Sequence, residues 1–253
     1  MLTISWYALS GKREAKQQLN KRKRRNDNAM KTLCSTEGMQ TSFIISDLNP
    51  AYYDAIRELF FTPHEYGFAK TYLANTPHLD IFYQHFARTA EEMVLQTARI
   101  HPAPWEQALL ALMQKVAGQG LQWYLAGSAA LAARGLDVVP RDLDLIVDIA
   151  GAHSLGNLLF DELIQPVEES RGWISNWFGR AFLHTRIEWI GGVHEDVDEN
   201  GMTEYGPAAA SRLETINWQG YELLVSPLDI QLEVSKRRGL DERVKKIEQI
   251  IAS

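Results

Sequence analysis

Two aspartates stand two residues apart in a stretch that otherwise has the composition of a buried strand. Asp142 and Asp144 alternate with Leu143 and Leu145, and two more apolar residues follow. Because side chains in a strand point alternately to opposite faces, both carboxylates lie on one face and both leucines on the other. Like charges this close repel each other unless a cation lies between them. Mg²⁺ prefers one or two carboxylates together with phosphate oxygens, so the pair predicts a divalent-metal site.

A short segment upstream has the composition of a phosphate-binding turn. Gly127-Ser128 follows the apolar run Trp123–Ala126 and precedes the helix formers Ala129–Ala133, with Gly135 as a C-terminal cap. The turn therefore lies at a helix N-terminus, where unpaired N–H groups and the helix dipole favour an anion. Together, the two motifs predict a nucleoside triphosphate held by the turn, while metal ions on the aspartates activate an incoming hydroxyl.

The spacing of the two motifs resembles the signature of the nucleotidyltransferase superfamily, which includes polymerase beta, the aminoglycoside nucleotidyltransferases and the minimal nucleotidyltransferases. That signature has a hydrophobic residue, Gly, Gly or Ser, a spacer, and then Asp-hydrophobic-Asp/Glu-hydrophobic. Here thirteen residues separate Gly127-Ser128 from Asp142. The resemblance covers roughly residues 104–251. It implies a third carboxylate on a later strand, and Glu188 within Phe182–Ile190 matches that position.

The resemblance also implies a role for each site residue. Asp142 and Asp144 would hold two Mg²⁺ ions, and Glu188 would bind the ion that activates the nucleophile and serve as a base. Ser128 would hydrogen-bond a phosphate, and Lys236 near the C-terminus would neutralise triphosphate charge. The predicted activity is transfer of a nucleoside monophosphate from a triphosphate, with ATP as the expected donor, to an acceptor hydroxyl.

The strand that carries Glu188 is expected to place two more polar side chains beside it. With a period of two, His184, Arg186 and Glu188 share one face. Arg186 and His184 would then point toward the substrate. An ordinary solvent face with a salt bridge is the alternative.

The predicted fold class is mixed α/β, a small mixed sheet flanked by helices with an N-terminal helical addition. The three predicted regions are a basic, disordered tail (1–40), a helical accessory region (41–103) and a nucleotidyltransferase domain (104–253). The elements expected from periodicity and capping residues are helices near 50–61 and 78–100, a helix opening at Pro104, a helix capped by Ser154 and running to Ile164, a strand near 220–225, a helix opening at Pro227 and a final helix at 240–251.

Charge is unevenly distributed along the chain. Residues 1–31 hold nine Lys or Arg against two acidic residues, and the remaining chain holds 17 basic and 30 acidic residues. The basic run Lys21–Arg25 is interpreted as a solvated tail; contact with RNA and an organelle presequence are the alternatives. Met30 and Met39 are alternative starts. The acidic body suits a cationic acceptor such as an aminoglycoside.

Composition predicts a globular protein of the reducing cytoplasm. The 253 residues are 45% hydrophobic, enough for a substantial core, and Cys34 is the single cysteine, which excludes an intramolecular disulfide. No apolar run is long enough for a membrane span. Two other functions stay open: a toxin-type transferase that modifies RNA or protein, and a non-catalytic nucleotide-binding member. Asp196 and Asp198 imitate the start of a calcium-binding loop, but Pro207 stands where that loop needs a glutamate.

Overall fold

The computed structural model describes residues 30–252, so most of the predicted basic tail, Lys21–Arg25 included, lies outside the described residues. The chain divides into two compact units, one ending at Ala74 and one beginning at Asn75. Within residues 30–252, every helix is too short or too polar to cross a membrane.

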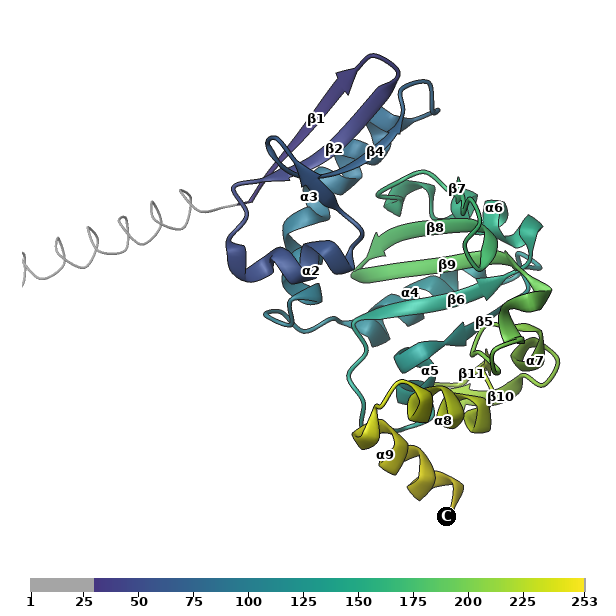
Figure 1. Cartoon of the computed structure of the whole chain (residues 1–253). Helices are drawn as coiled ribbons and strands as arrows, with labels where there is room; N and C mark the ends of the chain where they lie inside the picture. Colours follow the sequence, from purple (N-terminus) through teal and green to yellow (C-terminus); the bar gives the residue numbers. More distant parts are fainter. Residues whose placement is uncertain (1–29, 253) are drawn as a thin grey trace, which may run out of the picture. The chain divides into compact units, whose positions relative to one another are not determined.

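The first unit is an antiparallel sheet with the strand order β1-β2-β4-β3 and a short helix (Figure 1). Its elements are β1 (Lys31–Glu37), β2 (Gln40–Ser46), the 3₁₀ turn η1 (Pro50–Tyr52), α2 (Tyr53–Glu58), β3 (Thr62–His64) and β4 (Gly67–Leu73). Phe43 of β2 and Tyr72 of β4 pack edge to face, with ring centroids 4.9 Å apart. Tyr53 of α2 packs edge to face on Phe68 of β4, with ring centroids 4.9 Å apart, so the helix packs against this sheet.

The predicted helical region 41–103 is wrong for most of residues 40–73, and the predicted tail contains strand β1. Aromatic and β-branched residues explain the difference, because Phe43, Ile44 and Ile45 are consecutive and all buried. Such a run favours a strand covered on both faces over an amphipathic helix. Pro50 does open a helical segment, and the Asn49 side chain caps it by accepting a hydrogen bond from Ala51 N.

The second unit contains a mixed sheet with the strand order β10-β11-β5-β6-β9-β8-β7. β6 runs parallel to β9 and β11 runs parallel to β5, while the other pairs are antiparallel. The strands are β5 (Trp123–Ala126), β6 (Asp142–Val147), β7 (Glu168–Glu169), β8 (Ser175–Leu183), β9 (Thr185–Val193), β10 (Glu214–Trp218) and β11 (Tyr221–Val225). The central pair β6 and β9 carries the three predicted acids.

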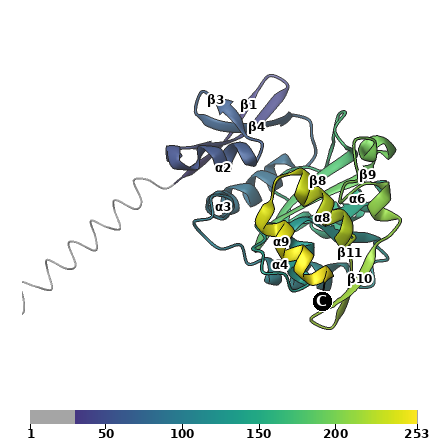
Figure 2. The same ribbon diagram turned by 60° about the horizontal axis from the view of Figure 1, so that its bottom comes forward.

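Helices cover one face of this sheet and one edge (Figure 1). The helical elements are α3 (Leu79–Thr97), α4 (Trp105–Val116), α5 (Gly127–Ala133), α6 (Ile149–Leu158), the 3₁₀ turns η2 (Phe160–Glu162) and η3 (Glu195–Asp198), α7 (Pro207–Ala210), α8 (Leu228–Arg237) and α9 (Asp241–Ile251). α4 and α6 pack against β6, β8 and β9. Trp189 of β9 is buried there and donates from Nε1 to Ala152 O of α6 at 3.1 Å. Figure 2 shows α8 and α9 lying against each other.

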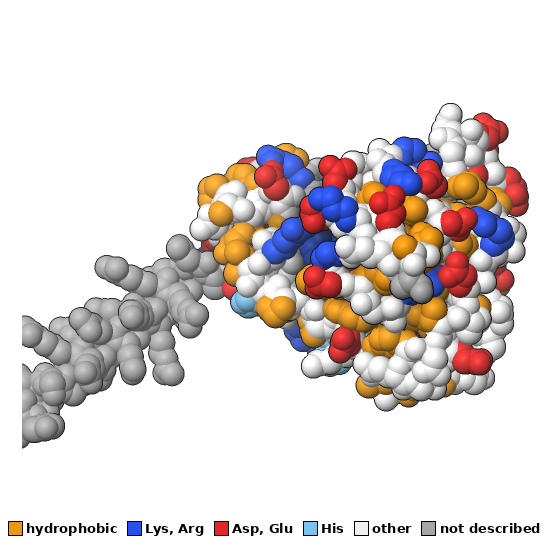
Figure 3. Space-filling model, turned by 90° about the horizontal axis from the view of Figure 1, so that it is seen from below, with side chains coloured by type: hydrophobic (Ala, Val, Ile, Leu, Met, Phe, Trp, Pro, Cys, Tyr) orange, Lys and Arg blue, Asp and Glu red, His pale blue; other side chains and the backbone are white. Residues whose placement is uncertain are grey.

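The predicted mixed α/β fold is confirmed, and most expected elements in residues 75–252 are present. One helix begins earlier than expected: α6 starts at Ile149, because the Asp148 side chain caps it through Gly151 N. Ser154 lies inside that helix, where its hydroxyl donates to Ala150 O. The face drawn in Figure 3 shows acidic and basic side chains interspersed with hydrophobic ones.

Candidate active site

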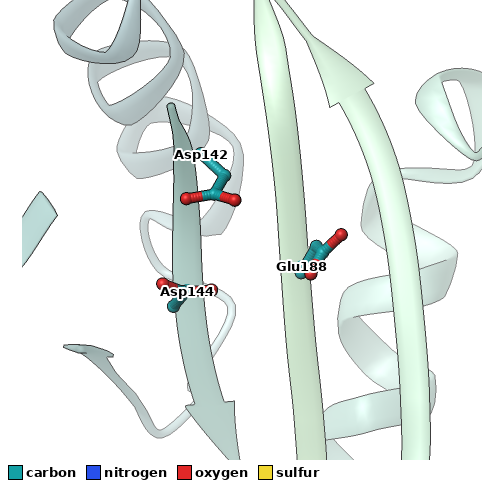
Figure 4. Close-up of side chains that lie close together, drawn as sticks. All are labelled: Asp142, Asp144 and Glu188. Atoms are coloured by element: carbon teal, nitrogen blue, oxygen red, sulfur yellow. The ribbon is translucent and has the colours of Figure 1, made fainter. Parts of the chain in front are cut away.

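Three carboxylates meet on two neighbouring strands (Figure 4). Because β6 and β9 are parallel, their register places Asp144 beside Glu188 and Asp142 beside Arg186. Ligand oxygens of Asp142, Asp144 and Glu188 all lie within 4.8 Å of one another. The predicted acids are therefore together in the fold, although Asp144 and Glu188 are 44 positions apart in the sequence.

The alternation of β6 keeps the carboxylates away from the helices. Leu143 and Leu145 are buried on the opposite face. Leu145 is in register with Trp189, whose ring lies against α6, so that face is the one covered by helices. A shift of one residue would turn both aspartates into the core, which fixes the register of the strand.

Two buried arginines pair with the acids. Arg186 pairs with Asp142, and its Nε lies 2.9 Å from Glu188 Oε1. Arg180 of β8 lies beside Glu188 in register, donates from Nε to Glu188 Oε1 at 2.6 Å and donates to Gln165 at 3.2 Å. Burial would lower the pKa of Arg186, but Glu188 and Asp142 outweigh it and raise that pKa, so Arg186 is a fixed cation.

The surroundings of Asp144 disfavour the charged form of its carboxyl group. Its pKa is raised well above the ordinary value, first by burial and then by the charges of Asp142 and Glu188, while Arg186 acts in the opposite direction. Two carboxylates directly opposite each other on neighbouring strands repel. Oxygen ligands with this spacing and excess negative charge fit a hard divalent cation such as Mg²⁺.

The Gly127 turn adjoins the acids, as predicted. Gly127 has a φ of +65°, and a Cβ at this position would collide with the Asp144 carboxylate. Only glycine combines this backbone conformation with so close an approach. Gly127 N donates to Glu204 Oε2 at 2.8 Å, and Ser128 follows in the first turn of α5.

Glu204 is a site residue that the sequence did not predict. It is buried, and Gln231 of α8 donates from Nε2 to its Oε2 at 2.9 Å and to Gly127 O at 3.0 Å. The segment before it is held by Asp198, whose Oδ1 accepts from Thr203 N at 2.7 Å. The Glu204 carboxylate thus accepts the hydrogen bond of Gly127 N, which lies in the turn predicted to bind a phosphate. No local pattern could reveal this, because the two partners are 77 positions apart in the sequence.

Asp198 has a structural role in the loop that imitates a calcium site. Its Oδ2 accepts from Ala208 N at 2.9 Å, so both carboxylate oxygens hold the backbone of the loop. Asp196 and Asp198 lie in the short turn η3.

The end of α8 brings arginines to the site. Lys236 lies near Glu233 and Glu248, at 3.4 and 3.5 Å, on an exposed surface. Arg237 and Arg238 line the pocket that contains Asp144. Arg237 donates to Met202 O at 2.7 Å.

His184 does not share the face of Arg186 and Glu188. It has a φ of +63° and forms the tight turn between β8 and β9, so the expected single strand 182–190 is two strands. The turn is anchored by Gln96 of α3, which donates to His184 O at 3.0 Å and accepts from Thr185 Oγ1 at 2.8 Å.

A pocket of about 470 Å³ opens in front of the acids. Asp144, Glu188 and Glu204 lie in its lining, together with Gly127 and the two arginines of α8. Its remaining lining is largely apolar and includes Ile146, Trp173, Ile174, Phe178, Ile190 and Tyr205.

Comparison with known proteins finds similarity only at the level of structure. No protein-family model matches the chain, and no curated protein gives a match. Similar solved structures include TM1012 of Thermotoga maritima, described as a candidate nucleotidyltransferase, with 17% identity and a TM-score of 0.46 over 60% of this chain and 96% of that one. They also include the lincosamide antibiotic adenylyltransferase LnuA in its lincomycin-bound form, with 13% identity and a TM-score of 0.41 over 57% and 97%.

Proposed function

We propose that this protein is a metal-dependent nucleotidyltransferase. It moves a nucleoside monophosphate from a nucleoside triphosphate, with ATP as the expected donor, to an acceptor hydroxyl. The observation that carries the proposal is the meeting of Asp142, Asp144 and Glu188 on one sheet face, beside the Gly127 turn. Such a group of carboxylates is costly to bury, and the paired arginines do not relieve the repulsion at Asp144, which favours a functional site over a structural one.

In the proposed reaction, the acceptor oxygen bonds to the α-phosphorus while the bond between the α- and β-phosphates breaks. Pyrophosphate leaves with the electron pair, and Glu188 takes the hydroxyl proton. Bound Mg²⁺ would supply charge neutralisation and polarise the phosphate. The three carboxylates would hold it.

The triphosphate is placed by the Gly127 turn and the end of α8. Gly127 lets phosphate oxygens approach the backbone, and Ser128 donates a hydrogen bond to them. Arg237 and Arg238 take the role first expected of Lys236, because they line the pocket while Lys236 lies beside two surface glutamates.

A second candidate is a nucleotide-binding member without turnover, and the pairing of Arg186 favours it. Arg186 engages Asp142 and Glu188, so a guanidinium already neutralises part of the charge that metal ions would neutralise. The resemblance implies two metal ions. For Asp142 to bind them, its ion pair with Arg186 would have to break. Such a protein would bind triphosphate tightly and release no pyrophosphate.

Pyrophosphate release tests the proposal directly. The full chain is incubated with each ribonucleoside triphosphate and Mg²⁺, with total small-molecule extract or total RNA as the acceptor. We expect Asp142→Asn and Asp144→Asn to lose more than about 100-fold in rate, since each removes a metal ligand. Asp229→Asn, at an exposed aspartate paired with Arg212, is the matched control and keeps the full rate.

The melting temperature shows whether a variant has lost activity because it is unfolded. Without Mg²⁺, Asp144→Asn should raise the melting temperature by about 2–4 °C for each kcal/mol of repulsion that it removes. Mg²⁺ should stabilise the parent chain and not this variant. Equal pyrophosphate release by the parent and both site variants would rule out the proposed chemistry. Tight triphosphate binding with no release would support the second candidate.

A further inference from the structure

The sheet face that carries the acids continues into an apolar surface. Two residues beyond Asp144 on β6 stands Ile146, and two residues beyond Glu188 on β9 stands Ile190. Phe178 lies in register with Ile190 on β8. Because the period of a strand is two, these side chains share the face of the carboxylates. They line the same pocket.

Trp173 and Phe178 form an aromatic wall beside this surface. Trp173 is 46% exposed, and its ring meets the ring of Phe178 edge to face at a centroid distance of 5.9 Å. Ile174 also lines the pocket. A large aromatic side chain held at the rim of an apolar hollow leaves hydrophobic area in water, and such hollows are the usual form of small-molecule sites.

The opposite side of the pocket has a different chemistry. Gly127 lines it there and directly follows β5, while Arg237 and Arg238 line it from the end of α8, the helix whose Gln231 donates to Gly127 O. These groups suit phosphate, whereas the aromatic wall offers no charge to a phosphate chain. The carboxylates of Asp144 and Glu188 lie on the strands between the two sides. The pocket therefore has an anionic-ligand side and an apolar-ligand side.

We infer that the acceptor is a small molecule with an uncharged apolar body that packs against Trp173, Ile174 and Phe178. Its hydroxyl reaches Glu188, where the transfer takes place. This inference rests on the proposed function and names its acceptor class. The volume of about 470 Å³ belongs to the whole pocket, so the acceptor would take only the part beside Trp173, Ile174 and Phe178.

The inference replaces the expectation of a cationic acceptor, which rested on net charge alone. Three acidic residues line the pocket, and each is already engaged elsewhere. Asp144 and Glu188 belong to the metal site, and Glu204 binds Gly127 N. The acidic excess of the chain is therefore not concentrated on the apolar side of the pocket.

The first experiment identifies the acceptor pool. The full chain is incubated with Mg²⁺ and α-labelled ATP, or whichever triphosphate releases pyrophosphate. Three acceptor pools are compared: the reversed-phase-retained fraction of a small-molecule extract, its cation-exchange-retained fraction, and total RNA. We expect labelled product from the reversed-phase fraction.

The second experiment tests the aromatic wall. Trp173→Ala should raise the KM for the active fraction about tenfold or more, because about 1.4 kcal/mol of apolar contact corresponds to that factor. Trp173→Phe should keep most of the affinity. Neither variant should change the Kd for ATP. Tyr66→Ala, at an exposed aromatic residue of the first unit, is the matched control.

Several results would overturn the inference while leaving the proposed function intact. Asp142-dependent labelling of the cation-exchange fraction or of RNA would do so. A loss of ATP affinity in Trp173→Ala, with unchanged acceptor KM, would assign the wall to the nucleobase instead. Absence of pyrophosphate release with every triphosphate and every pool would overturn both proposals.

Discussion

Glu204 occupies a backbone N–H that the proposed function assigns to the triphosphate. Its carboxylate accepts from Gly127 N and from the Gln231 side chain, while Arg237 donates to Met202 in the same segment. Two groups that the proposed function assigns to the triphosphate are therefore engaged by the protein itself. Phosphate must compete with this internal anion.

Glu204→Gln should therefore strengthen nucleotide binding. The amide oxygen still accepts from Gly127 N, but the negative charge that repels phosphate is gone. We expect the Kd for ATP to fall by about tenfold, the effect of roughly 1.4 kcal/mol, as measured by isothermal titration calorimetry with Mg²⁺. Glu233→Gln, near Lys236 on the surface, is the matched control. An unchanged or higher Kd in Glu204→Gln would refute this role.

At the residue scale, local pattern predicted only part of the site. Asp142 and Asp144 followed from alternation, and the position of Glu188 came from the family resemblance. The pairing of Arg180 with Glu188 depends on the register of β8 against β9, which alternation alone does not fix. Glu204 was unpredictable, because its partner lies across the fold.

At the element scale, the hairpin of β8 and β9 explains a wrong prediction. Polar and apolar residues alternate from Arg186 to Trp189, and no glycine or proline marks the tight turn at His184, so residues 182–190 were taken as one strand. The turn is recognisable only from the positive φ of His184 and its anchor on Gln96. Similarly, β2 was taken as helical because its three consecutive buried residues Phe43, Ile44 and Ile45 give no alternation to distinguish a strand.

The same hairpin depends on a glycine. Gly179 lies in register with Trp189, and a Cβ there would overlap the indole ring. We expect Gly179→Ala to lower the free energy of unfolding by about 1–3 kcal/mol, because the core cannot absorb the added carbon without moving the ring. Urea denaturation followed by circular dichroism measures this loss.

A double-mutant cycle isolates the cause. Adding Trp189→Phe to Gly179→Ala should recover part of the loss, since the smaller ring leaves space for the methyl group. Additive losses would mean that the glycine is needed for another reason.

At the scale of the whole molecule, the acids, the turn and the pocket all belong to the second unit. A chain of residues 75–253 should therefore fold and bind ATP with Mg²⁺ with the Kd of the full chain, because a compact unit with its own core is expected to fold alone. Circular dichroism and calorimetry on the shortened chain check this. A folded fragment that has lost ATP binding would show that the first unit contributes to the site.

The parallel pairing of β6 with β9 has a consequence for the order of folding. Parallel neighbours need a crossover, so residues 148–184 must be in place before Glu188 reaches Asp144. Closing so long a loop is slow compared with forming a helix or a hairpin. During synthesis, the cluster of three carboxylates is completed only after β9 has left the ribosome and docked. A partly made chain thus has both aspartates and still lacks the third carboxylate beside them.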